Sequence, residues 1–338
     1  MVDLTPYNTL RIPARAQNLI EITSVDQISK EINKGTFQKP FFILGCGANV
    51  LFTRDFPGTI ILVKIPGKKI ISETDPGILI ELGAGENWSD FVPWAVDHNW
   101  SGCENLALIP GTAGAAAVGN ISAYGQNQED IFVELKAINL TTAAAEKLTK
   151  PDMQYSYRES ILKKESAGKY LVTSVTYRLN KNTRLELSYQ AARHASLLPE
   201  LQKIANKPYS PKDVSQAVIS LRTAKLPDIK TLPNAGSMFK NPIITASQAE
   251  SIKTQIPDLQ TYPEKDARLV KLPAGMLLDH LGWKGKRIGH VGTAPNHALI
   301  VCNYGGATGS QIFEFTESMR ADVLKHFSIN LEYEVMVI

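Results

Sequence analysis

The chain has 338 residues, and 43% of them are hydrophobic. A chain of this length exceeds the usual size of a single hydrophobic core, so we expect two or three globular domains. Its 36 basic and 33 acidic residues give a formal net charge of +3 without any concentrated basic block. This balance argues against nucleic-acid and membrane-surface partners, and it is compatible with an anionic small-molecule substrate.

The cysteines and histidines indicate neither a disulfide framework nor a metal site. Cys46, Cys103 and Cys302 are odd in number, widely spaced and without a CxxC pair, which favours a reducing compartment. The six histidines show no HExxH or comparable ligand spacing, so no metal is expected. The N-terminus lacks a signal-peptide core, and the longest apolar segment, near residues 41–52, is too short to span a bilayer. We therefore expect a cytoplasmic protein.

The first half of the chain predicts a mixture of strands and helices. Short apolar runs between residues 41 and 82 are broken by Gly, Pro and Asp, a pattern that is typical of strands and turns. Residues 87–98 predict a helix. Further strands are expected near residues 131–140 and 170–179, the second because its apolar side chains alternate.

A new unit is expected to begin near residue 200. Four helices are predicted in it by their start, stop or periodicity signals: one starting at Ser210-Pro211, one capped by Thr245 and Gln248, one over residues 274–281 ended by Gly282, and one over residues 312–327. Residues 331–337 then alternate as in a strand, with Glu334 on the polar face.

Two glycine-containing segments are candidates for ligand binding. Residues 102–125, called here the glycine-rich segment, contain five glycines and six alanines and almost no charge, so they predict either a ligand cradle or a tightly packed loop. Residues 45–49 (GCGAN) follow a buried strand and predict either a backbone nest for an anion or a plain strand turn. Neither segment carries the signature of a P-loop or of a Rossmann fold.

Three polar residues could take part in chemistry. The guanidinium of Arg158 could hold a carboxylate and stabilise negative charge, although its polar surroundings also fit a surface turn. Ser237 follows Gly236 on a tight corner and lacks a G-x-S-x-G elbow, so a proton donor is more plausible chemistry than an acylating serine. Glu334 could orient a substrate or a proton donor if its face of the strand lines a cleft, and it is an ordinary exposed carboxylate if that face meets water.

Read together, these segments resemble the UDP-N-acetylenolpyruvoylglucosamine reductase (MurB) family over nearly the whole chain. The resemblance rests on nine collinear motifs: YNTLRI, LGCGANVLF, GAGENW, the glycine-rich segment, YSYRESILK, RTAKLPD, NAGSMFKNP, AGMLLDHLGWKGKRIG and LEYEV. It implies an α+β fold in which a two-part FAD-binding domain of the vanillyl-alcohol-oxidase/PCMH type precedes a C-terminal α+β substrate-binding domain. The expected domains are residues 1–66, residues 67–199 and residues 200–338, with the last strand returning Glu334 to the active site.

The same resemblance implies an activity. The family binds FAD noncovalently, takes electrons from NADPH and reduces UDP-N-acetyl-3-O-(1-carboxyvinyl)-glucosamine to UDP-N-acetylmuramate in peptidoglycan precursor synthesis. Arg158, Ser237 and Glu334 match the family's active-site arginine, proton-donating serine and active-site glutamate. A cytoplasmic monomer without nucleic-acid or membrane partners is expected.

The resemblance also implies binding residues. Those expected at the cofactor are Gly45, Cys46, Gly47, Ala48, Asn49, Ile109, Gly111, Thr112, Gly114, Ala115, Ala116, Asn120, Ala123, Tyr124 and Gly125. Those expected at the substrate are Tyr189, Lys225, Asn241, Lys284 and His297, with the tyrosine and lysine suited to the UDP diphosphate. The presence of Tyr189 points to the longer, type I branch of the family.

Some positions depart from the family pattern. Ala117, Gly119 and Ser122 stand where that pattern has a proline, a glutamine and a glycine, and His297 stands where it has a glutamine that contacts substrate. Two alternatives therefore stay open: another FAD-dependent oxidoreductase of the same fold, for example one with covalent flavin, or a flavin-binding relative without turnover.

Overall fold

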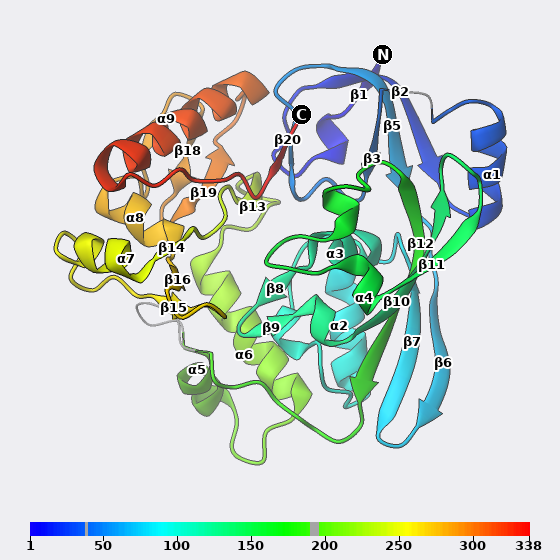
Figure 1. Ribbon diagram of the computed structural model, residues 1–338, viewed down its shortest axis with the longest axis horizontal. Coiled ribbons are helices and arrows are strands. Elements are labelled where there is room, and N and C mark those ends of the chain that lie inside the picture. Colours follow the sequence, from blue (N-terminus) through cyan, green and yellow to red (C-terminus); the bar gives the residue numbers. More distant parts are fainter. Residues whose placement is uncertain (38–39, 190–195) are drawn as a thin grey trace. The chain divides into compact units, whose positions relative to one another are not determined.

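The computed structural model describes residues 1–37, 40–189 and 196–338, which divide into two compact units (Figure 1). The larger unit comprises Ala16–Cys46 and Pro57–Ala224, and the smaller unit comprises Met1–Arg15, Gly47–Phe56 and Lys225–Ile338. Each unit has a hydrophobic core of its own.

The larger unit is built on a five-stranded antiparallel sheet. Its strands, in spatial order, are β11 (Ala145–Thr149), β10 (Phe132–Asn139), β12 (Tyr170–Asn180), β7 (Gly77–Gly83) and β6 (Lys68–Thr74). Strand β12 confirms the alternation expected near residues 170–179, because Leu171, Val175, Tyr177 and Leu179 are fully buried. A second sheet contains β2 (Arg15–Ile22), β5 (Phe56–Val63) and β3 (Phe41–Leu44), of which β3 and β5 run parallel.

Two helices pack on the five-stranded sheet (Figure 1): α3 (Ala113–Gly119) contacts β12 and β7, and α2 (Trp88–Asp97) contacts β12 through Tyr177. Helix α2 begins at Asn87, whose side chain accepts a hydrogen bond from the Ser89 N–H. Its Trp88 and Phe91 rings lie 5.5 Å and 5.9 Å from the ring of Tyr177 on β12. Helix α3 lies within the glycine-rich segment. The larger unit also contains α1 (Val25–Asn33), α4 (Lys150–Met153), α5 (Leu197–Ile204), β8 (Ser122–Ala123), β9 (Gln126–Asn127) and α6 (Pro211–Lys225).

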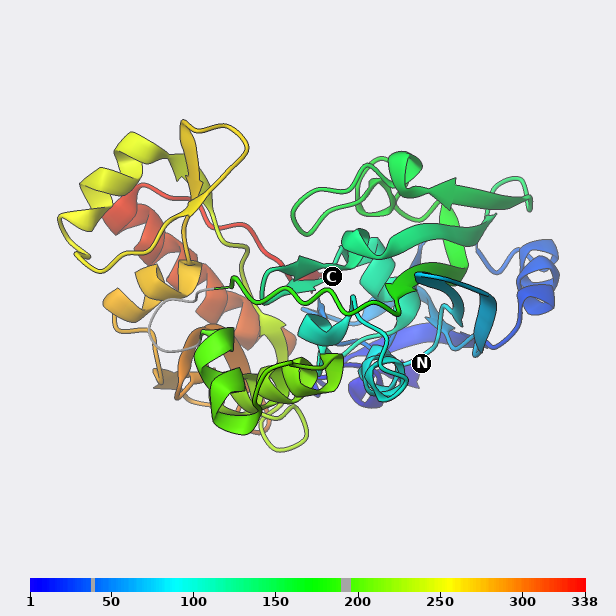
Figure 2. The ribbon, with the colours of Figure 1, turned by 90° about the horizontal axis from the view of Figure 1, so that it is seen from below.

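The smaller unit has a four-stranded antiparallel sheet in the order β13 (Asn234–Ser237), β19 (His297–Asn303), β18 (Val291–Ala294) and β17 (Arg287–Ile288). Helices α8 (Ala274–His280) and α9 (Gly309–Phe327) pack on this sheet and on each other (Figures 1 and 2). The remaining elements of this unit are β1 (Val2–Asp3), β4 (Val50–Leu51), β14 (Ile243–Thr245), α7 (Ala246–Lys253), β15 (Tyr262–Pro263), β16 (Leu269–Lys271) and β20 (Met336–Val337).

The helices predicted in the second half are confirmed, but the division of the chain differs from the expected one. Helix α6 starts at Pro211, and the N-caps of α7 and α9 are Thr245 and Thr308. The units divide at residue 225 instead of near residue 200, because Leu201, Val214 and neighbouring apolar side chains of α5 and α6 are buried in the core of the larger unit. Residues 1–15 and 47–56 belong with the C-terminal part of the chain and not with the residues between them.

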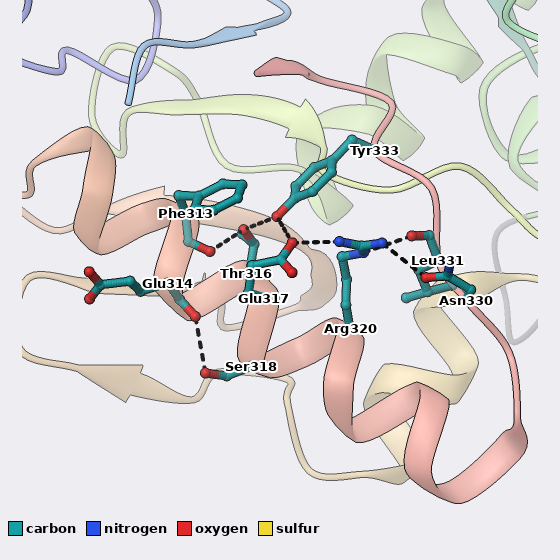
Figure 3. A network of polar contacts seen from close by, with 9 residues as sticks. All are labelled: Phe313, Glu314, Thr316, Glu317, Ser318, Arg320, Asn330, Leu331 and Tyr333. Atoms are coloured by element: carbon teal, nitrogen blue, oxygen red, sulfur yellow. Dashed lines mark hydrogen bonds and ion pairs between the residues drawn. The ribbon is translucent and has the colours of Figure 1, made fainter. Parts of the chain in front are cut away.

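The strand predicted over residues 331–337 is wrong for most of its length, since only Met336–Val337 is a strand, paired in parallel with β4. The preceding residues form only an isolated β-bridge, between Tyr333 and Phe239, and the Lys240 N–H donates to the Glu332 carbonyl at 2.8 Å. They are also held by α9 (Figure 3). The Tyr333 hydroxyl donates to Glu317 Oε1 at 2.7 Å and lies 2.7 Å from Thr316 Oγ1, and Arg320 Nε donates to the Leu331 carbonyl at 2.8 Å. The alternation of this segment reflects burial against a helix.

Candidate active site

Gly45, the first residue of the GCGAN turn, lies close to the glycine-rich segment within the larger unit. A Cβ added to Gly45, directly after β3, would lie 3.0 Å from Thr112 Oγ1 and 3.4 Å from the Ala115 Cβ. A side chain at residue 45 would therefore crowd the start of α3. The absence of a side chain at Gly45 lets the end of β3 pack closely on the glycine-rich segment.

The start of α3 is anchored to the protein itself. Its first two N–H groups donate to the carbonyls of Glu86 at 2.8 Å and Ala84 at 3.0 Å, and the third approaches the Thr112 hydroxyl at 3.4 Å. Gly114 faces Ala84 so closely that an added Cβ would lie 3.0 Å from the Ala84 Cβ. These N–H groups are used for packing, so a ligand phosphate would have to bind elsewhere in the segment.

Other glycines of the segment face open space. Among the described residues, no heavy atom lies within 4 Å of a Cβ built on Gly111 or Gly119, and Gly111 has a φ of +155°. In the same unit, Asn105 Oδ1, Gln126 Oε1 and Arg222 Nε are buried and have no hydrogen-bond partner in the described part of the chain. Buried polar atoms without partners are costly. These atoms and the open backbone are compatible with a polar ligand such as a flavin.

Arg158 is held against the glycine-rich segment. Its guanidinium donates from Nη1 to Ser122 Oγ at 2.8 Å and from Nη2 to the Ser122 carbonyl at 3.2 Å. Its own carbonyl accepts a hydrogen bond from Lys163 Nζ at 3.0 Å, and its φ is +59°, in the left-handed region. The structure therefore brings the predicted catalytic arginine to the predicted cofactor segment, 36 residues away in sequence.

Asn120, an expected cofactor residue, makes hydrogen bonds within the protein. Its Nδ2 donates to the Ser156 carbonyl at 3.0 Å and to Glu129 Oε1 at 3.2 Å, and its left-handed backbone ends α3. The Ser160 hydroxyl reinforces this attachment by donating to the Val118 carbonyl at 2.7 Å. The Asn120 amide thus ties the loop that carries Arg158 to the end of α3.

Tyr124 and Tyr189 lie next to each other, with ring centroids 5.4 Å apart. Asn105 Nδ2 joins their segments by donating to the Tyr124 carbonyl at 2.7 Å and to the Glu186 carbonyl at 2.9 Å. Burial raises the pKa of the Tyr124 hydroxyl, and the nearby Arg222 guanidinium opposes this rise. The sequence analysis missed Arg222, although RTAKLPD had drawn attention to Lys225 in the same motif.

In the smaller unit, Ser237 and Glu334 lie on neighbouring segments. Ser237 ends β13 after Gly236, whose φ is +74°. The Glu334 N–H donates to the carbonyl of Met238 at 2.9 Å, directly after Ser237. The Glu334 carbonyl accepts a hydrogen bond from Asn49 Nδ2 at 3.1 Å, so the last residue of the GCGAN turn lies beside Glu334. Gly47 in that turn must be glycine, since its φ is +69° and a Cβ would lie 2.0 Å from the Tyr7 carbonyl oxygen.

Three predicted substrate residues lie at α8 and at the start of β19. His297 Nδ1 accepts a hydrogen bond from the Leu299 N–H at 3.2 Å. Burial, reinforced by the Lys225 ammonium and opposed by Asp279, lowers the pKa of the His297 imidazole to about 4. Lys284 Nζ forms an ion pair with Asp279 at 2.7 Å. The Asn241 side chain accepts from the Ala274 N–H at 3.0 Å, at the start of α8. Because the pKa of His297 is about 4, its ring is neutral at pH 7, and because Nδ1 accepts a hydrogen bond, Nε2 carries the proton.

Within the described ranges, no group of three or more His, Cys, Asp or Glu side chains could hold a metal ion. No helix in the described part of the chain is both long enough and apolar enough to cross a bilayer. Arg158 belongs to the larger unit, whereas Ser237 and Glu334 belong to the smaller one.

Comparisons with known proteins match the N-terminal and the C-terminal parts of the chain to known families. Residues 16–144 match the family model described as FAD binding domain, and residues 227–338 match that of the UDP-N-acetylenolpyruvoylglucosamine reductase C-terminal domain. The proteins named UDP-N-acetylenolpyruvoylglucosamine reductase from Flavobacterium johnsoniae and Burkholderia cenocepacia are 42% and 40% identical to the chain. The first alignment covers 99% of this chain and 98% of that protein, and the second covers 98% and 94%.

A solved structure has the same fold. The MurB crystal structure from Thermus caldophilus matches 99% of this chain and 97% of its own, with a TM-score of 0.67 at 20% identity. The predicted fold class, an FAD-binding part followed by a C-terminal domain, is confirmed. The chain belongs to the UDP-N-acetylenolpyruvoylglucosamine reductase (MurB) family of FAD-dependent oxidoreductases.

Proposed function

We propose that this protein reduces UDP-N-acetyl-3-O-(1-carboxyvinyl)-glucosamine to UDP-N-acetylmuramate with NADPH, in the cytoplasmic synthesis of peptidoglycan precursors. The observation that carries the proposal is the placement of the Arg158 guanidinium on the glycine-rich segment of the FAD-binding part, at Ser122. The names of the relatives that align along almost the entire chain support the same substrate.

The expected cofactor is noncovalent FAD, which would bind at the glycine-rich segment and would supply, once reduced by NADPH, the hydride for C3 of the enolpyruvyl group. Gly111 and Gly119 would leave room for it, and the buried polar atoms of Asn105 and Gln126 would be available to pair with it. Covalent attachment at Cys103 is disfavoured, because its burial raises the pKa of the thiol and keeps it protonated. Cys46 is exposed, so flavin colour that stays on the denatured chain would point to it.

Arg158 would bind the carboxylate of the enolpyruvyl group. Hydride addition at C3 drives negative charge onto that carboxylate, and a guanidinium in fixed position stabilises such charge more in the transition state than in the ground state. Arginine suits this task because its fork of donors matches a carboxylate in two parallel hydrogen bonds.

Ser237 would deliver the proton to C2, with Glu334 keeping the donor and substrate oriented. A serine is a weak acid, but the substrate after hydride addition is a strong base, so proton transfer from the hydroxyl becomes favourable. The hydrogen bond between the Glu334 N–H and the Met238 carbonyl fixes the two segments side by side.

Binding of the UDP part would fall to the remaining predicted residues. We expect Tyr189 and Lys225 at the diphosphate, with Asn241, Lys284 and His297 nearby. The neutral His297 ring would offer an Nε2–H donor, which can replace the amide donor of the glutamine in the family pattern.

The decisive experiment follows the flavin spectrum of the purified protein under anaerobic conditions. NADPH should bleach the flavin, and subsequent addition of the enolpyruvyl substrate should restore its colour and yield UDP-N-acetylmuramate, identified by mass. A flavin that bleaches and does not recolour would refute the reductase assignment and favour a flavin-binding relative without this turnover. Gel filtration of the same sample tests the expected monomer.

A further inference from the structure

Ser122 makes two contacts with the side chain of Arg158. Its hydroxyl and its carbonyl oxygen each accept a hydrogen bond from a different guanidinium nitrogen, at 2.8 Å and 3.2 Å. The carbonyl would be present with any residue at this position. The hydroxyl requires serine or threonine at this position, where the family pattern described above has glycine.

The backbones on both sides of this contact are well fixed. Ser122 belongs to a short hairpin in which it pairs with Asn127. The Arg158 loop is closed by the bridge between Ser156 and Glu159 and attached to α3 by the Ser160 hydroxyl. The main freedom left to Arg158 is rotation of its long side chain, and ordering such a side chain costs up to about 2 kcal/mol. The two Ser122 oxygens restrict that rotation before substrate arrives.

The charge of the acceptors matters as well. Both Ser122 oxygens are neutral, so they orient the guanidinium without neutralising its positive charge, as a carboxylate partner would. The second arginine of this region, Arg222, adds to the positive field around the site. Burial lowers the pKa of its guanidinium, and the nearby Arg158 lowers it further. The contacts from Ser122 therefore do not oppose, by charge, the binding of an anionic substrate group.

We propose that Ser122 is a positioning residue that holds the Arg158 guanidinium ready for the carboxylate of the enolpyruvyl substrate. The proposal rests on the proposed function of Arg158. It predicts that Ser122 contributes to reduction of the substrate and contributes nothing to reduction of the flavin by NADPH.

The test measures both half-reactions separately by anaerobic stopped-flow absorbance in the flavin-loaded protein. Ser122→Ala should slow substrate reduction about tenfold, the size expected for losing one hydrogen bond to a charged group, and leave flavin reduction unchanged. Ser122→Thr, which keeps the hydroxyl, should recover most of the rate, and Ser122→Gly should behave as the alanine variant. Ser174→Ala is the matched control: it removes a part-buried hydroxyl of the larger unit, which donates to Glu81 Oε2 at 3.2 Å on the five-stranded sheet, and should leave substrate reduction within about twofold.

A double-mutant cycle decides whether Ser122 acts through the arginine. In an Arg158→Ala background, Ser122→Ala should change the rate of substrate reduction by less than about twofold. A further tenfold loss in that background, or an unchanged rate of Ser122→Ala in the wild-type background, overturns the proposal. If the wild-type protein itself fails to reduce the substrate, the proposed function has failed instead, and the two failures are distinguished by that measurement.

Discussion

His297 provides a quantitative test of how burial controls charge in the smaller unit. Its imidazole has a native pKa of about 4, against 6.5 for an unperturbed histidine, chiefly because of burial and secondarily because of the Lys225 ammonium. Asp279 acts in the opposite direction, and its ion pair with Lys284 limits that effect. The perturbation is His297→Gln, which keeps a hydrogen-bonding side chain and removes the titrating group.

The sign of the effect follows from which state binds the proton more tightly. The native ring binds its proton less tightly than the unfolded chain does, so this histidine has no effect on stability above pH 6.5 and destabilises progressively as the pH falls from 6.5 toward 4. At about pH 5 the unfolded histidine is protonated and the native one is not. Each pH unit below the pKa of the unfolded histidine lowers the free energy of unfolding by roughly 1.4 kcal/mol. At about pH 5 the total loss is therefore about 2 kcal/mol.

Urea unfolding of the wild type and the variant at about pH 7.5 and about pH 5 measures this loss. The wild type should lose about 2 kcal/mol more than His297→Gln between the two pH values. His290 is exposed, and His290→Gln is a matched control that should lose as much as the wild type. Equal losses in the wild type and His297→Gln would refute the conclusion that His297 is held neutral.

Three further predictions concern catalysis and stability. Ser237→Ala should reduce its flavin normally with NADPH and lose on the order of 10²- to 10⁴-fold in substrate reduction, as measured by stopped flow; unchanged turnover would remove Ser237 from the mechanism. Gly47→Ala should prevent soluble expression or lower the melting temperature sharply, because its Cβ would lie 2.0 Å from the Tyr7 carbonyl oxygen, while Gly77→Ala, whose nearest contact is 3.8 Å, should fold normally. Tyr333→Phe should lower the free energy of unfolding by about 1.5–3 kcal/mol through loss of its hydrogen bond to a carboxylate on α9, and an unchanged urea midpoint would contradict this.

Much of the local structure could be predicted because its causes are local. Proline at the first helical position, the threonine N-cap of α7 and the alternating side chains of β12 act within a few residues, and each predicted its element correctly. The alternation of residues 331–337 was misleading for the same reason. An alternating pattern indicates that one face of a segment is buried, but it does not indicate what covers that face. Here α9 contributes to the burial, so most of the segment does not form a regular strand.

The sequence predicts the candidate site as a set of residues but not as an arrangement. The nine motifs point to Arg158, Ser237, Glu334 and the two glycine-containing segments. They did not indicate that Asn120 is used to hold the Arg158 loop, or that Ser122 would contact the guanidinium. Those contacts join residues 36 positions apart, so they depend on how β8 and the loop after α4 pack on α3.

The sequence by itself determined the family and the mixed α+β class, because motif order and periodicity are written in neighbouring residues. Only the tertiary structure decided which groups are buried, which face each other and which unit α6 joins. The neutral state of His297 and the orientation of Arg158 are of this second kind, since desolvation and hydrogen-bond geometry arise when distant segments pack together.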